Sequence, residues 1–525
     1  MSHLNDKLAA LADSGKRDLL TFSRGIEKES LRVDLQGKLA TTPHPPFLGS
    51  KLTHPLITTD YSEAQLELIT PVSTSVSEMM STLNDIHRFV YSGLHDELLW
   101  SASMPCVLQG DENVPIAQYG SSNLGKLKTT YRNGLGHRYG RSMQTISAVH
   151  YNFSFSDTFW NQLAGMEGKS GQAPAYRSKR YFDLIRNFRR FSWLLIYLFG
   201  SSPAVCDTFV KGRVHNLEKF DAGSLYTKGA TSLRNGDLGY QSDTQSNLVD
   251  ICFNSLSDYV SSLVEAICTP YEEYRKLGVK KDGEYLQISP NILQSEAEFY
   301  STIRAKRNTP RGTNFLQLLN DEGVEYIEVR LLDVDPYVPH GISEKEINFL
   351  DAFLLFCLLE DSPTHDDSLC KSVKDNVMRT VYRGRDGNTL LDDQNSERSI
   401  NEWGQEVISA MQPVADFMDT IQGGDRHSRS VSEQRDKLIN PTLTPSARIL
   451  EDMQSESIPF FRFAMNKSLE HQRHFLEEPM SKEEMEYFDR LSEQSRAEQT
   501  EIEQRDSSDF DQFLKEFLAG YESLR

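Results

Sequence analysis

The sequence Arg24-Gly25-Ile26-Glu27-Lys28-Glu29-Ser30-Leu31-Arg32-Val33 sets the expectation for the fold. Its alternation suits a strand, because side chains two positions apart share one face of a strand. Glu27 and Glu29 are then side by side, roughly 7 Å apart. Two carboxylates so placed repel each other unless water surrounds them or a cation lies between them. The stretch is therefore either an exposed edge strand with two hydrated acids or one half of a metal site.

Acids recur on other predicted strands. Residues 58–71 and 324–332 alternate polar and apolar side chains in the same way. Buried or half-buried carboxylates need partners, and several in one place imply cations. The acids on or beside these predicted faces are Asp60, Glu63, Glu67 and Glu328.

A fourth predicted strand, residues 144–155, adds other polar groups. His150 and Asn152 share one of its faces. An oxygen-rich site with one histidine favours Mg²⁺, with Mn²⁺ as a tolerated substitute. Independent surface acids are the alternative interpretation, and His150 alone is more often an ordinary strand histidine than a ligand.

The arrangement of elements predicts an α+β fold with an antiparallel sheet, because regular βαβ alternation is missing. Helical patterns occur at residues 176–200 and 245–268, and again from Ser343 onwards. Residues 105–140 are rich in Gly, Asn and Tyr and predict a long loop with short helical pieces. The charged tail beyond Ser481 predicts a capped helix with a solvated face or a frayed end.

Composition excludes several classes of protein. The chain has 525 residues and a net charge of −20, which argues against a general nucleic-acid or anionic-membrane partner. Its six cysteines form no C-x-x-C pair, which is typical of reduced, structural cysteines. We find no signal peptide, and the longest apolar runs are far shorter than the roughly 20 residues of a membrane span. We therefore expect a cytoplasmic protein.

One Gly-rich segment imitates a phosphate-binding loop. Residues 120–127 nearly match G-x-x-x-x-G-K-[ST], but Leu127 replaces the hydroxyl residue that would bind Mg²⁺. No buried apolar strand precedes the segment. We interpret it as a flexible loop.

Arginines and tyrosines in polar segments are further candidates. Guanidinium groups can clamp phosphate or carboxylate oxygens with two hydrogen bonds, although a lone arginine is more often part of a surface ion pair. Tyrosines beside Gly-rich segments often line pockets, although a half-buried core position is more common. These candidates are Arg132, Arg234, Arg330, Tyr131, Tyr240 and Tyr300.

Taken together, the motifs resemble one family. They occur in one order along the chain, at residues 24–32, 58–63, 117–123, 143–153, 230–240 and 325–330. This set resembles the glutamate–cysteine ligases (γ-glutamylcysteine synthetases) of the γ-proteobacterial type. The similarity extends from about residue 20 to 355 and continues more weakly through the C-terminal helices.

The resemblance implies a fold similar to the catalytic core of glutamine synthetase, with a curved antiparallel sheet that holds metal ions. Residues 1–360 would form the catalytic core, and residues 361–525 a mainly helical region packed on it. The Mg²⁺ ligands it implies are Glu27, Glu29, Asp60, Glu67, His150 and Glu328. We expect two groups of ligands, Glu27 with His150 and Glu328, and Glu29 with Asp60 and Glu67.

The resemblance also implies roles for the other candidates. Arg234 and Arg330, with Glu328, would act at the transferred phosphate or the glutamate, and Asn152 would lie on the glutamate side. The cysteine pocket it implies comprises Tyr61, Tyr131, Arg132, Leu135, Tyr240 and Tyr300.

The activity it implies is the first step of glutathione synthesis, in which glutamate, cysteine and ATP give γ-glutamylcysteine, ADP and phosphate. We expect a monomer that is feedback-inhibited by glutathione and has no nucleic-acid or membrane partner. The alternatives are a related ATP-dependent ligase that uses another amine, a non-catalytic amino-acid or glutathione sensor, and a metallohydrolase. A bifunctional enzyme that also adds glycine would need a second ATP-binding domain, of which the sequence shows no sign.

Overall fold

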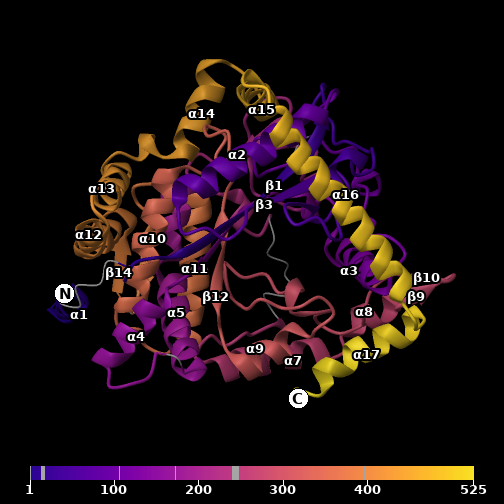
Figure 1. Ribbon diagram of the computed structural model, residues 1–525. Helices are drawn as coiled ribbons and strands as arrows, with labels where there is room; N and C mark the ends of the chain where they lie inside the picture. Colours follow the sequence, from indigo (N-terminus) through magenta and orange to yellow (C-terminus); the bar gives the residue numbers. More distant parts are fainter. Residues whose placement is uncertain (1, 13–17, 106, 172, 239–247, 395) are drawn as a thin grey trace.

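The computed structural model describes residues 2–12, 18–105, 107–171, 173–238, 248–394 and 396–525. Its main sheet is antiparallel, with strand order β11-β12-β5-β1-β3-β2 and β4 also paired with β1 (Figure 1). The predicted α+β class with an antiparallel sheet is confirmed. The strands are β1 Ser23–Asp34, β2 Ile57–Thr59, β3 Gln65–Ile69, β4 Glu97–Leu99, β5 Val149–Ser154, β11 Ile303–Lys306 and β12 Tyr326–Leu332.

Strand β1 lies inside the sheet, with β5 on one side and β3 on the other. The interpretation of this stretch as an exposed edge strand is therefore wrong. In the observed register, Glu29 is opposite Glu67 on β3 and Glu27 is opposite His150 on β5. On β12, Glu328 is opposite Asn152 of β5. Since directly opposed residues share a face, the acids of β1, β3 and β12 gather on one side of the sheet.

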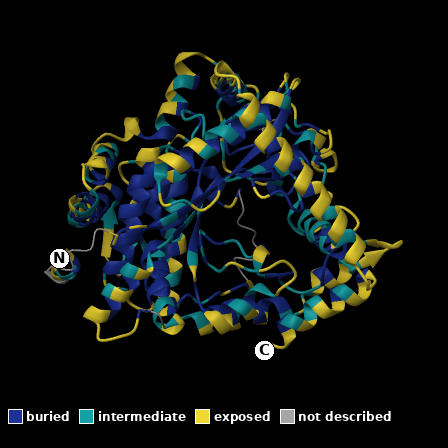
Figure 2. Ribbon diagram, viewed as in Figure 1, coloured by how far each residue is buried: buried dark blue, intermediate teal, exposed yellow. Residues whose placement is uncertain are grey.

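Two largely buried helices cover the other face of the sheet: α5 Pro174–Phe199 contacts β11 and β12, and α10 Glu344–Leu359 packs on α5 (Figure 2). Helix α10 is apolar on nearly every side, which is typical of a helix enclosed in a core. Its buried Asp351 accepts hydrogen bonds from Arg24 at 2.6 Å and from the Tyr151 hydroxyl at 2.6 Å. This network ties β1 and β5 to α10 and fixes which face of the sheet presents the acids.

The remaining helices surround this core. They are α1 Ser2–Ala12, α2 Val76–Gly93, α3 Asn123–Tyr139, α4 Asp157–Met166, α7 Leu256–Cys268, α8 Glu272–Leu277, α9 Phe315–Glu322, α11 Asp367–Arg383, α12 Ile400–Gln422, α13 Arg426–Ile439, α14 Pro445–Ser455, α15 Phe460–Glu477, α16 Lys482–Arg505 and α17 Phe510–Glu522. A small sheet contains β6 Ala204–Cys206, β7 Glu218–Lys219 and β8 Ser224–Tyr226, and two hairpins pair β9 Lys280–Lys281 with β10 Glu284–Tyr285 and β13 Leu390–Asp393 with β14 Ser396–Ser399.

Several predicted boundaries are wrong. Residues 123–139 form the continuous helix α3 rather than a loop. The Ser122 side chain caps α3 by accepting a hydrogen bond from Gly125 N, which offsets the poor helix propensity of its glycines. Of the helix expected at residues 245–268, only the part from Leu256 is helical, and the polar stretch at residues 383–398 contains the β13–β14 hairpin.

The C-terminal tail is better packed than its charge suggests. Helix α16 begins with the predicted capping box of Ser481 and Glu484. It is not frayed, because Ser495 Oγ is buried and accepts a hydrogen bond from Ser50 N at 2.9 Å. One hydrophobic cluster includes residues from Leu4 to Tyr521, so the proposed division at residue 360 stays a prediction.

Two further expectations concern cysteines and membranes. Cys206, Cys252, Cys268, Cys357 and Cys370 are free thiols, and Cys106 lies outside the described residues. In the described part of the chain, no helix has both the length and the apolar character needed to cross a bilayer.

Candidate active site

A cluster of carboxylates lies on the polar face of the sheet. Glu27, His150 and Glu328 offer ligand atoms within 4.8 Å of one another, and so do Glu29, Glu67 and His150. His150 Nδ1 lies 3.4 Å from Glu27 Oε2 and 3.5 Å from Glu328 Oε1, while its Nε2 lies 3.6 Å from Glu29 Oε1. Glu27 and Glu29 therefore belong to different groups, and His150 lies between them.

The two groups differ in electrostatic environment. Burial alone would raise the pKa of Glu328, but the cations of Arg330 and Lys306 hold it well below its ordinary value. Arg330 Nη1 donates to Glu328 Oε1 at 2.7 Å, and Lys306 Nζ lies 3.3 Å from Oε2.

Among the described residues, no lysine or arginine forms an ion pair with Glu29 or Glu67 of the second group, and nearby arginines offset the effect of burial only in part. Burial, followed by the carboxylates of Asp60 and Glu67, raises the pKa of Glu29 well above its usual value. Burial, followed by Glu27 and Asp60, does the same to the pKa of Glu67. Burial and Arg330 lower the pKa of His150, so its imidazole is neutral and able to bind a metal ion. Carboxylates and a neutral imidazole are a donor set that suits Mg²⁺ or Mn²⁺.

A cleft of about 90 Å³ adjoins the acid cluster and borders on Glu29, Asp60 and Arg330. It brings together five residues predicted for the cysteine pocket, although they come from distant parts of the chain. These residues are Tyr61, Tyr131, Arg132, Leu135 and Tyr300.

Helix α3 forms one wall of the cleft and holds Asp60 in place. Arg132 Nε donates to the Asp60 carbonyl, and the Arg132 guanidinium lies 4.5 Å from the ring centre of Tyr119. The Tyr119 hydroxyl donates to Thr59 O at 2.7 Å. The helix comes close to Tyr61, since a Cβ added at Gly136 would lie 2.5 Å from the Tyr61 hydroxyl.

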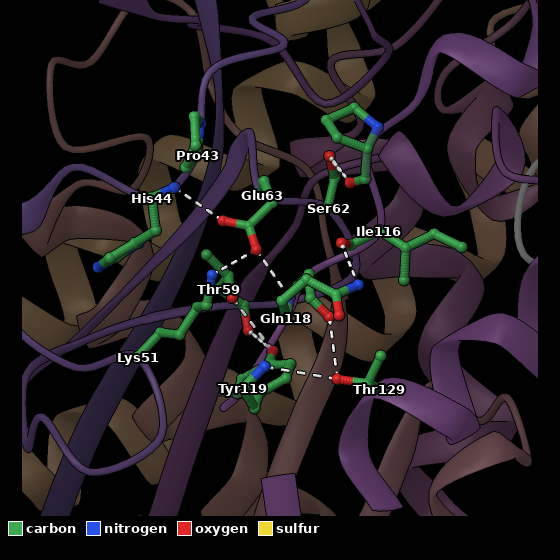
Figure 3. A network of polar contacts seen from close by, with 12 residues as sticks. Pro43, His44, Lys51, Thr59, Ser62, Glu63, Ile116, Gln118, Tyr119 and Thr129 are labelled. Atoms are coloured by element: carbon green, nitrogen blue, oxygen red, sulfur yellow. Dashed lines mark hydrogen bonds and ion pairs between the residues drawn. The ribbon is translucent and has the colours of Figure 1, made fainter. Parts of the chain in front are cut away.

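Glu63, which the alternating pattern places with the other acids, belongs to a different network (Figure 3). The β3 strand begins only at Gln65, so Glu63 lies in the preceding turn. Its carboxylate accepts hydrogen bonds from His44 N and Gln118 N at 2.7 Å each and pairs with Lys51. Glu63 therefore connects the segments that contain His44, Lys51 and Gln118, and both of its carboxylate oxygens have partners within the protein.

The other predicted residues lie in varied positions. Asn152 Nδ2 donates to Glu27 Oε1 at 2.8 Å, on the side of the cluster away from the cleft wall formed by α3. Arg234 is buried in the short helix η4 (Leu233–Asn235) and donates to the Arg330 carbonyl at 2.6 Å. Tyr300 lines the cleft, and its hydroxyl donates to Asn235 Oδ1 at 3.2 Å. Tyr240 lies outside the described residues.

Sequence reasoning missed several cleft residues. Glu298 lines the cleft and accepts from Arg138 at 2.9 Å and from the Tyr139 hydroxyl at 2.6 Å. Arg304 and Lys306 lie on β11, where Arg304 is directly opposite Glu328. Arg304 and Lys306 are two positions apart in the sequence, as Glu27 and Glu29 are, and this strand-like spacing of basic residues could have identified them.

The near-match to a phosphate-binding loop is explained by the structure. The backbone N–H of Ser121 donates to Glu503 at 2.9 Å, and that of Asn123 donates to Asp506. Both acids belong to the C-terminal part of the chain. The amide groups that would bind a phosphate are therefore bound to carboxylates of the protein itself.

Comparison with known proteins assigns the family. The model of the glutamate–cysteine ligase family matches residues 8–380. The chain belongs to the glutamate–cysteine ligase family. The glutamate–cysteine ligase of Alcanivorax borkumensis is 47% identical over 99% of this chain and 100% of that protein. The enzyme of the same name from Pseudomonas putida strain KT2440 is 46% identical over 99% of each chain.

A solved structure of the family has the same fold. The glutamate–cysteine ligase of Francisella tularensis, in complex with AMP, superposes with a TM-score of 0.90 at 33% identity, covering 96% of this chain and 99% of that one. This chain is therefore a ligase, and its reaction is the ATP-dependent formation of γ-glutamylcysteine, the first step of glutathione synthesis. The acid cluster and the cleft beside it are the candidate active site.

Proposed function

We propose that the acid cluster and the adjoining cleft divide this reaction between them. The cluster handles the glutamate γ-carboxylate and the phosphate of ATP, and the cleft binds the cysteine. The observation that carries the proposal is the position of the cleft, which borders both on Glu29 and Asp60 of the acid side and on Arg330. A group bound in the cleft would therefore lie next to the site of phosphoryl transfer.

Two groups of side chains would hold Mg²⁺, with Mn²⁺ as a substitute. One is Glu27, His150 and Glu328, and the other is Glu29 and Glu67, with Asp60 nearby and His150 within reach. The raised pKa values of Glu29 and Glu67 support this assignment, because a cation between them would relieve the cost of burying carboxylates that repel each other. Bound Mg²⁺ would supply positive charge that stabilises the transferred phosphoryl group.

The arginines complete the phosphoryl side. A γ-carboxylate is a poor electrophile, so it is first converted by ATP into γ-glutamyl phosphate. Arg330 donates to Glu328, and its remaining N–H groups are available to the developing charge of the phosphate. Arg234 fixes the position of Arg330 by donating a hydrogen bond to its backbone carbonyl. Asn152, which donates to Glu27, would contact the glutamate.

The cysteine amine then attacks the acyl carbon and displaces phosphate. Tyr61, Tyr131, Leu135 and Tyr300 enclose the cleft, and Arg132 offers a cation to the cysteine carboxylate. Enclosure matters because water would otherwise hydrolyse the acyl phosphate. We assign Tyr240 to the same pocket from the family resemblance.

We make further proposals about the fold likeness, the feedback inhibition, the location and the oligomeric state of the protein. An antiparallel sheet with acids on one face supports a likeness to the glutamine synthetase core. Glutathione contains γ-glutamylcysteine, so the groups that bind the substrates would also bind it as a feedback inhibitor. We further propose a cytoplasmic monomer.

The test is ADP release from MgATP with glutamate and cysteine, with each component omitted in turn. We expect Glu328→Ala to keep the fold and to lose about 10²–10³-fold in kcat, since it removes a positioned charge. Glu325→Ala, at an exposed position three residues earlier, is the matched control and should retain activity. Near-normal turnover of Glu328→Ala would overturn the site, and a preference for another amine would favour the related ligase.

A further inference from the structure

The C-terminal helices α16 and α17 contact the elements that form the walls of the cleft, although they lie beyond the residues 8–380 that match the family. The end of helix α16 and the residue after it, Asp506, bind the N-terminus of α3 through the two carboxylate contacts with Ser121 and Asn123 described above. Negative charge at a helix N-terminus is favourable. Helix α3 carries Tyr131, Arg132 and Leu135 of the cleft, so its position depends on this contact.

Helix α17 packs against the same helix further along. Phe510 and Leu514 of α17 form a small apolar cluster with Leu127 of α3 and with Ile288. Tyr131, which lines the cleft, packs against this cluster. Figure 1 shows α17 beneath α3 and beside α7 and α9, where it closes the outer side of this region.

The last turn of α17 is bound to the opposite wall. The Tyr521 hydroxyl is buried and donates to Glu296 Oε2 at 2.5 Å. Glu296 begins the short helix η5 (Glu296–Glu298), and the cleft is lined by the three residues Ala297, Glu298 and Tyr300 that follow it closely. Burial, followed by the Glu296 carboxylate, holds the pKa of Tyr521 well above its usual value, so its hydroxyl remains a donor.

We propose that α17 sets the spacing of the two walls of the cleft, and that Tyr521 is a positioning residue for the cysteine substrate. One side of α17 is bound to the wall formed by α3 and its end is bound to the wall formed by residues 296–300. The inference rests on the proposed assignment of the cleft to cysteine. Among the described residues, the main contacts of α17 are with α3, α7 and α9, and none of its main contacts is with a strand of the sheet that forms the glutamate and ATP side.

The decisive variant is Tyr521→Phe, which keeps the ring and removes one hydrogen bond. Loss of this hydrogen bond to a charged carboxylate would loosen the wall formed by residues 296–300, so we expect about a fivefold increase in KM for cysteine. The KM values for glutamate and MgATP and the kcat should change less than about twofold.

A second variant, Phe510→Leu, tests the contact of α17 with α3 independently and should also raise the KM for cysteine. Lys515→Ala, at an exposed position of α17, is the matched control and should leave all constants unchanged.

A purely structural role for α17 predicts a different result. In that case Tyr521→Phe would lower the unfolding temperature and leave every KM unchanged, and this outcome would overturn the inference. Leu135→Ala separates this failure from failure of the cleft assignment. If Leu135→Ala raises the KM for cysteine and neither α17 variant does, the positioning role is wrong. If Leu135→Ala has no effect on that KM, the assignment of the cleft itself is wrong.

Discussion

Glu63 and Glu67 are four residues apart and have opposite roles. The carboxylate of Glu63 has three partners within the protein, Lys51 and the amides of His44 and Gln118. Glu67 faces Glu29 across the β1–β3 ladder, and the pKa of Glu67 is raised by burial and by its acidic neighbours. The first acid stabilises the fold, and the second costs stability until a cation is bound.

We predict that Glu67→Gln stabilises the protein by about 1 kcal/mol in a chelating buffer, because it removes a repelled charge. The same variant should gain little stability on addition of Mg²⁺ and should lose activity, whereas the wild type should gain stability with Mg²⁺. Urea unfolding with and without Mg²⁺ measures both effects.

Glu63→Gln is the matched comparison and should lose about 2–3 kcal/mol with or without Mg²⁺, because it leaves Lys51 without its counter-charge. If Glu67→Gln were instead the destabilised variant and Glu63→Gln the neutral one, the assignment of the two acids would be reversed.

The sequence predicts which residues carry charge but not which charges meet. Alternation correctly placed Glu27, Glu29 and His150 on one face, because a continuous strand has a fixed period. It misplaced Glu63, because the chain turns before β3 and the period is interrupted. Glu298 was missed because its partners, Arg138 and Tyr139, are about 160 residues away in the chain. No local pattern reports such a contact.

At the scale of elements, the most informative wrong prediction is the loop expected where helix α3 forms. Its glycines and polar residues predict a loop, and the helix forms because its cap, the acids of the C-terminal segment and the packing of α17 against it all stabilise it. Helices α5 and α10 were predictable because their apolar residues alone require burial. An element stabilised by distant parts of the chain has little local signal.

Gly136 of α3 provides a test of this close packing. Alanine in place of a helical glycine normally stabilises by about 1 kcal/mol. At Gly136 the added methyl group would lie 2.5 Å from the Tyr61 hydroxyl. We therefore predict that Gly136→Ala destabilises by about 1–2 kcal/mol and raises the KM for cysteine, as measured by thermal unfolding and steady-state kinetics.

Two further variants control this prediction. Gly165→Ala, on α4 where a methyl group meets no neighbour within 4 Å, should show the ordinary gain in stability. Adding Tyr61→Phe to Gly136→Ala removes the clashing oxygen and should restore the stability. If the double variant were as unstable as Gly136→Ala, the contact with Tyr61 would not be the cause.

At the scale of the whole molecule, buried histidines link stability to pH. Several of them lie outside the acid cluster, and burial is the largest cause of their lowered pKa values, followed by nearby cations. These are His44, with a pKa of about 3, His54, about 4, His87, well below the ordinary value, His365, about 3, and His471, about 3.

A histidine with a lowered pKa in the folded state binds its proton more readily when the chain unfolds. Its stabilising effect is complete above the ordinary pKa of 6.5 and is lost as the pH falls from 6.5 towards the folded pKa, which is about 3 for His471. We therefore predict that the free energy of unfolding falls steeply between about pH 6 and pH 4.

The variant His471→Asn tests this prediction. It keeps a partner for the Ser101 hydroxyl, which lies 2.9 Å from His471 Nδ1, and it should reduce the slope of the unfolding free energy against pH by about 1.4 kcal/mol per pH unit. His95→Asn, at an exposed position, should leave the slope unchanged. Equal slopes for the wild type and His471→Asn in urea unfolding across this range would show that burial of His471 does not contribute to the acid sensitivity.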